Sequence, residues 1–150
     1  MELGTLEREI HVEATPEIVF EVVSRPEHIR EWWSDDASVD PTPGAFGEVV
    51  WGDRVKVAAL VVVDVDPPRR FSFRWTAPDG EAPVPGNSLL VTFDLEPSAG
   101  GTRLRLTESG FRERGWEAAV LEEAFRDHER GWDLFLPRLS SYAPSVVGQR

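Results

Sequence analysis

Apolar side chains recur every three or four residues between 116 and 142, near the end of the chain. This spacing places them on one face of an α-helix. A helix of that length spans about 40 Å, close to the diameter of a small domain. The face consists of Leu121, Phe125, His128, Trp132, Phe135, Leu139 and Tyr142. We therefore predict a long amphipathic helix whose apolar face, interrupted by the polar His128, packs on a surface formed by the rest of the chain.

The N-terminal part predicts one strand followed by two short helices. Residues 5–13 alternate between apolar and polar side chains, as in a strand with one buried face. Thr15 and Pro16 then provide an N-cap and a first helical residue, and a second short helix begins at Pro26 and runs to Trp33. Two short helices in this place would cover one end of a sheet.

Apolar and polar residues also alternate in the middle of the chain, and this pattern predicts five more strands. They are residues 44–51, 54–65, 70–76, 88–96 and 102–109. The polar segment 34–43 and the segment 77–87, which is rich in proline and glycine, are expected to be loops. Residues 144–150 are small and polar, and we expect a disordered tail there.

Short connections between successive strands favour antiparallel pairing. A sheet of about six strands twists and curls, and the long helix can fill its concave face. We predict a single α+β domain over residues 1–143.

Several short motifs occur in this order along almost the whole chain. They are Ala14-Thr15-Pro16-Glu17-Ile18-Val19-Phe20, Trp32-Trp33, Pro67-Pro68-Arg69-Arg70-Phe71 with Trp75, Leu106-Thr107-Glu108-Ser109-Gly110-Phe111, and Gly131-Trp132 with Leu136 and Leu139. Together they resemble the START-like (SRPBCC) superfamily, in the branch named for the activator of heat-shock protein 90 ATPase. The resemblance implies the helix-grip fold, a curved antiparallel sheet wrapped around a long C-terminal helix.

The same resemblance implies a pocket between the sheet and the helix. Members of the superfamily bind lipids, sterols, polyketides and other apolar molecules, and a few are cyclases, dehydratases or hydrolases. A fold alone does not assign one of these functions.

The composition and net charge of the chain argue against several classes of function. The formal net charge is −11, with 27 acidic residues against 16 Lys and Arg, so nucleic acid and anionic lipid are expected to be repelled. No apolar run approaches the ~20 residues of a membrane span, and no signal peptide is visible. The chain has no cysteine, which excludes disulfides and thiolate sites within it and fits a cytoplasmic protein. Six tryptophans are enough to line a cavity as well as a core.

Three polar residues lie on predicted apolar faces: His128 on the helix, and Arg8 and Glu108 on strands. Either they form a polar patch in an apolar pocket, where they could transfer protons, or they are hydrogen-bonded structural groups and strand-end residues that reach water. Metal binding is not expected, because the three histidines have no ligand spacing, and neither is a cofactor.

We expect the ligand-binding residues to be largely aromatic. The candidates are Trp33, Phe46, Trp51, Phe73, Trp75, Phe93, Phe111, Leu121, Phe125, His128 and Trp132. Ordinary core packing is the alternative for each of them.

Three hypotheses follow. The first is a protein, monomeric or homodimeric, that binds a small apolar molecule of lipid, polyketide or aromatic type without catalysis. The second is an enzyme of cyclase, dehydratase or hydrolase type in the same cavity. The third is a protein-interaction module such as a chaperone regulator, for which a large exposed apolar patch is expected.

Overall fold

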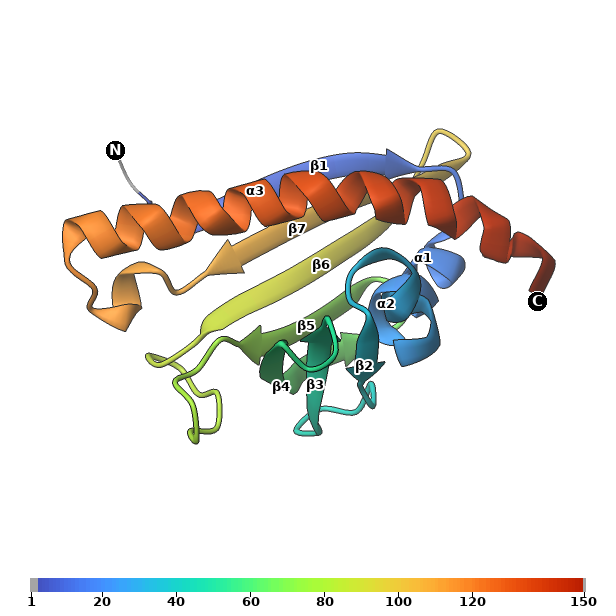
Figure 1. Ribbon diagram of the computed structural model, residues 1–150. Coiled ribbons are helices and arrows are strands. Elements are labelled where there is room, and N and C mark those ends of the chain that lie inside the picture. Colours follow the sequence, from blue (N-terminus) through green and yellow to red (C-terminus); the bar gives the residue numbers. More distant parts are fainter. Residues whose placement is uncertain (1–2, 150) are drawn as a thin grey trace.

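Seven strands form one antiparallel sheet in the order β1-β7-β6-β5-β4-β3-β2 in the computed structural model, which describes residues 3–149. The strands are β1 (Thr5–Val12), β2 (Asp36–Ser38), β3 (Phe46–Trp51), β4 (Lys56–Asp66), β5 (Arg70–Trp75), β6 (Leu89–Ser98) and β7 (Gly101–Ser109). The long helix α3 (Ala118–Tyr142) lies across one face of the sheet (Figure 1). This is the predicted helix-grip arrangement, with one strand more than the expected number of about six.

Two short helices, α1 (Pro16–Ser24) and α2 (Pro26–Trp32), lie together at the end of the sheet where α3 finishes (Figure 1). The hydroxyl of Thr15 accepts a hydrogen bond from the backbone N–H of Ile18, as an N-cap does, and Pro16 is the first helical residue. Pro26 is likewise the first residue of α2, although its N-cap residue, Arg25, forms no capping hydrogen bond through its side chain. Both helices therefore begin where the sequence predicts.

The core lies between α3 and the concave face of the sheet. Phe125, Trp132, Leu136 and Leu139 are the buried residues of α3. The sheet contributes alternate residues such as those of β6, whose burial follows the predicted period of two. Within the described chain, no helix is both long enough and apolar enough to span a membrane.

Two segments differ from the sequence-based expectation. Residues 34–43 were expected to be a loop, but they contain β2, a three-residue edge strand that pairs with β3. Three residues are too few to show alternation. The expected disordered tail instead continues α3 as a 3-10 helix, η2 (Ala143–Gln149), because Ala143 and Val146 are buried against the core. Arg150 and residues 1–2 lie outside the described residues.

The hairpin between β3 and β4 sets the positions of Trp51 and Lys56 relative to each other. Its turn uses left-handed backbone at Gly52 (φ +68°) and Arg54 (φ +58°). The register pairs Trp51 directly with Lys56. Side chains paired in this way lie on the same face of the sheet, so the turn brings an indole and an ammonium group together.

Candidate functional site

A carboxylate is buried at the centre of the domain. Glu108 on β7 shares a face with Leu104 and Leu106, as its strand parity predicts, and its side chain is 0% exposed. The indole N–H of Trp75 donates to Oε2 at 2.7 Å, and that of Trp132 donates to Oε1 at 2.9 Å. The same Oε1 lies 2.9 Å from Nδ1 of His128. The carboxylate is thus held by side chains from β5 and α3, which compensates its burial.

The contact with Glu108 orients the imidazole of His128. An ionised carboxylate only accepts hydrogen bonds, so we assign the proton of this contact to Nδ1. Nε2 lies on the other side of the ring and has no hydrogen bond to the described residues, yet it is not a fully buried atom. Since 18% of the side chain is exposed, Nε2 is the polar atom that His128 presents to solvent.

Trp75 and Trp132 belong to a group of five aromatic side chains in mutual contact, which we call the aromatic cluster: Trp33, Trp51, Trp75, Trp132 and Phe135. Trp33, the C-cap residue of α2, contacts three of the others. Its ring centroid lies 5.0 Å from that of Trp75, 5.4 Å from that of Trp132 and 5.6 Å from that of Trp51. The indole N–H of Trp51 donates to the backbone carbonyl of Trp33 at 2.8 Å, which fixes the cluster to the end of α2.

The aromatic cluster lines a cleft of about 340 Å³ beside α3. Its walls come from the end of α2, the β3–β4 hairpin, the end of β5 and the middle of α3. The lining residues are Trp33, Trp51, Lys56, Trp75, Asp127, His128, Arg130, Gly131, Trp132, Leu134 and Phe135. Trp75, Phe111 and Glu108 pack against His128 from the inside, so the space opens to one side of the helix rather than lying enclosed beneath it.

Five of the eleven residues proposed from the sequence to bind a ligand line this cleft: Trp33, Trp51, Trp75, His128 and Trp132. Four others, Phe73, Phe93, Phe111 and Phe125, belong to the buried core. Leu121 lies about two helical turns before His128 and lines a separate surface hollow beside Trp116.

Phe46 is 70% exposed and does not line the cleft. It lies five residues before Trp51 on the same strand, so the two side chains point to opposite faces of the sheet.

Several lining residues were not identified from the sequence. Phe135 belongs to the predicted helical stripe, which was the available signal. Lys56, Asp127, Arg130, Gly131 and Leu134 carry no local signal, because the hairpin register and the rotation of α3 bring them to the cleft.

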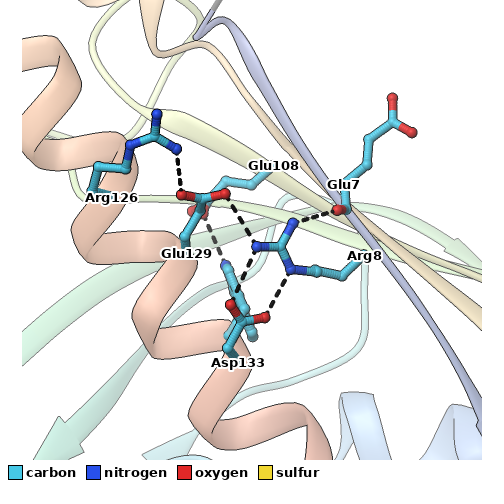
Figure 2. Close-up of polar contacts among 7 residues, drawn as sticks. Glu7, Arg8, Glu108, Arg126, Glu129 and Asp133 are labelled. Carbon is cyan, nitrogen blue, oxygen red and sulfur yellow. Dashed lines mark hydrogen bonds and ion pairs between the residues drawn. The ribbon is translucent and has the colours of Figure 1, made fainter.

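Arg8 points toward α3, as its parity predicts, but it does not reach Glu108 or His128. Its Nε donates to Oδ1 of Asp133 at 2.8 Å and its Nη2 to Oε2 of Glu129 at 3.1 Å (Figure 2). Arg126 binds the other oxygen of Glu129. Of the two alternatives stated for Arg8, a polar patch shared with Glu108 and His128 does not form, because two carboxylates one helical turn apart bind the guanidinium instead. Arg8 ties β1 to α3 and plays no part in the cleft.

These contacts shift the ionisation of the carboxyl groups. The hydrogen bond from Arg8 holds the pKa of Asp133 below its ordinary value, and the hydrogen bonds from Arg126 and Arg8 lower the pKa of Glu129. A depressed pKa in the folded state contributes stability above the unfolded-state pKa. That contribution is lost as the pH falls through the folded-state pKa.

Asp133→Asn should therefore lower the free energy of unfolding by about 0.5–1 kcal/mol at pH 7, as expected for a partly exposed ion pair. The difference from the parent protein should begin to shrink as the pH falls below about 4, where the unfolded state becomes protonated, and should disappear below the lower folded-state pKa of Asp133. Urea unfolding at several pH values measures this difference in the free energy of unfolding. Asp79→Asn, in the 77–87 loop, is the matched control and should show no such trend. A deficit of unchanged size at acid pH would contradict the assignment.

The other two histidines, His28 and His11, form contacts outside the cleft. Nδ1 of His28 in α2 lies 2.7 Å from the hydroxyl of Tyr142 at the end of α3, and His11 lies beside Glu13 on the surface. Burial, and then the charges of Glu31 and Glu27, raise the pKa of Tyr142. Among residues 3–149, no three His, Asp or Glu side chains converge as metal ligands would. The His28–Tyr142 contact joins α2 to α3 and so holds Trp33 against the helix.

The sequence of this chain matches a known family over residues 13–143, described as activator of Hsp90 ATPase homolog 1-like protein. No curated protein matches it. Among solved structures, protein MLL2253 from Mesorhizobium loti superposes with a TM-score of 0.75 at 24% identity, covering 91% of this chain and 94% of that one. The Aha1 dimer from Colwellia psychrerythraea superposes with a TM-score of 0.70 at 19% identity, covering 91% and 92%. Both likenesses concern the fold.

DynU16, a protein of the dynemicin biosynthetic locus, is 26% identical and superposes with a TM-score of 0.72. The match covers 93% of this chain but 46% of DynU16. The domain described above is therefore matched by about half of that longer chain.

Proposed function

The chain belongs to the family of activator of Hsp90 ATPase homolog 1-like proteins, within the START-like superfamily, and we propose that it binds a small, flat, mostly apolar molecule in the cleft beside α3. The observation that carries the proposal is the aromatic cluster, whose rings contact one another and together line an open cleft. A cleft of about 340 Å³ is at the small end of ligand sites. A ligand of a few fused rings suits it better than a long lipid chain.

The polar groups of the cleft also suit a ligand site. Apolar walls with a few convergent polar atoms are the usual composition, since the polar atoms fix orientation. Here Nε2 of His128 is such an atom, and its position is set by the buried Glu108. DynU16, as a product of a biosynthetic locus, is compatible with a small organic ligand for this chain as well.

The Glu108–His128 pair favours one second candidate, an enzyme that acts on the bound molecule. Nε2 would take a proton from the ligand, and the carboxylate of Glu108 would stabilise the resulting imidazolium. Removal of such a proton begins many cyclisations and dehydrations. Arg8, which was a third candidate for this chemistry, lies outside the cleft and is not included.

A ligand panel tests both candidates. Naphthalene derivatives, polyphenols of three or four rings and a ten-carbon fatty acid are added to the purified protein. The melting temperature and the tryptophan fluorescence are then measured. We expect the ring compounds to raise the melting temperature and change the fluorescence, because a ligand at 100 times its Kd adds about 2.7 kcal/mol to the apparent stability.

Mass spectrometry of the same samples separates the two candidates. Product formation that disappears in His128→Asn would favour the enzyme, and unchanged compounds would favour binding alone. If no ring compound binds, or if the fatty acid alone does, the proposed ligand class is wrong.

A further inference from the structure

Lys56 is the single lysine of a chain whose net charge is −11, and it lines the cleft. It is the first residue of β4 and pairs across the hairpin with Trp51. Its Nζ lies 5.4 Å from the centre of the Trp51 ring. The ammonium group is thus held at the aromatic wall by the hairpin register and by a cation–π contact.

The other charges of the cleft are already balanced within the protein. Arg130 donates to Asp127 at 3.4 Å, and these two exposed residues cancel each other. The second cation of the hairpin, Arg54, binds Glu48 at 3.1 Å and does not line the cleft. Lys56 forms no ion pair with any residue in the described part of the chain. The cleft therefore has an unmatched positive charge in a protein that is otherwise strongly acidic.

A chain of ring contacts leads from the ammonium group of Lys56 to the imidazole of His128. The Trp51 centroid lies 6.4 Å from that of Trp75, and Trp75 lies 5.6 Å from the ring of His128. Lys56 and His128 thus flank the two tryptophans. A planar molecule that contacts these tryptophans can interact with an ammonium group as well as with an imidazole nitrogen.

We propose that the cleft selects aromatic molecules that carry an anionic group, such as an aromatic carboxylate or phenolate, and that Lys56 binds this group. This inference rests on the proposed function and adds the charge of the ligand to it. Without a local cation, the field of a −11 protein would disfavour an anionic ligand. A charged hydrogen bond at the edge of an aromatic wall is stronger than one in open water.

Three probes with the same naphthalene ring test the inference: 2-naphthoate, 2-naphthalenemethanol and 2-naphthylmethylammonium. Their Kd values are measured by calorimetry at low ionic strength. We expect naphthoate to bind most tightly, the alcohol less tightly and the ammonium compound least. Lys56→Met should weaken naphthoate about tenfold and leave the alcohol within about twofold, with the circular dichroism spectrum unchanged.

Arg54→Met is the matched control. It removes the other cation of the same hairpin, which does not line the cleft. It should leave the preference for naphthoate intact. Equal affinities of naphthoate and the alcohol, or the same preference in Lys56→Met, would overturn the inference while leaving the proposed function standing. A preference for the ammonium probe would show that the aromatic faces, not Lys56, set the charge selectivity. If none of the probes binds, both the inference and the proposed function are wrong.

Discussion

Glu108→Ala should lower the free energy of unfolding by about 3–5 kcal/mol, the cost of breaking a buried charged cluster. The carboxylate is completely buried and accepts from the indole N–H groups of Trp75 and Trp132 while it contacts Nδ1 of His128. Alanine leaves those donors without an acceptor, and each unsatisfied buried donor costs about 1–3 kcal/mol. Urea unfolding followed by circular dichroism gives the free energy and the slope m.

Two further variants show whether hydrogen bonding is the cause. Glu96→Ala removes a half-exposed carboxylate that pairs with Arg103 across the hairpin between β6 and β7, and it should cost less than about 1 kcal/mol. Glu108→Gln keeps the shape but replaces one acceptor oxygen with an NH2 group that faces an indole donor, so it should also destabilise. If Glu108→Gln is as stable as the parent, the three contacts do not stabilise the fold.

Trp33→Ala should have the second large effect, because one side chain both packs the core and builds the cleft. Trp33 is 5% exposed and contacts the rings of Trp51, Trp75 and Trp132. Truncation of a buried aromatic residue costs about 3–5 kcal/mol. The loss of the stacked pair formed with Trp132 should also reduce the near-UV circular dichroism signal, and ring compounds that bind the parent should lose affinity.

Trp116→Ala is the matched control for this variant. Trp116 lies before α3, is partly buried and contacts the guanidinium of Arg114 rather than the aromatic cluster. It should cost less stability and leave binding of ring compounds within about twofold, a change of about 0.4 kcal/mol. Trp33→Leu keeps more of the packing volume and separates a loss of binding from a loss of folding. Equal binding by the parent and Trp33→Leu would contradict the role of the Trp33 ring in the cleft.

The periodicity of the sequence was sufficient to predict most elements. The apolar spacing between residues 116 and 142 predicted α3 within two residues of its observed start at Ala118, and alternation placed six strands. The two main differences, β2 and η2, are short segments held by neighbours. β2 forms because β3 offers an edge to pair with, and η2 because Val146 reaches the core.

The sequence predicted about half of the residues that line the cleft, but not the contacts between them. Strand parity placed Trp75 and Glu108 on the apolar side of their strands but left open whether Glu108 faces the core or reaches water, and helical spacing placed His128 and Trp132 on the face of the helix that packs on the sheet. These local periods do not give the partner of an inward polar group. Arg8 illustrates this limit, since its direction was predicted and its partners, Glu129 and Asp133, were not.

The sequence by itself determined most of the elements and the face on which most of their side chains lie, because both depend on periods of two or 3.6 residues within one element. The tertiary structure decided which side chains meet. Glu108 and its hydrogen-bond partners, Trp75, His128 and Trp132, lie on three elements, and their convergence depends on the strand register and on the rotation of α3 over the sheet. Lys56 reaches the cleft through the register of one hairpin, so only the folded chain shows that its single lysine lies at the aromatic wall.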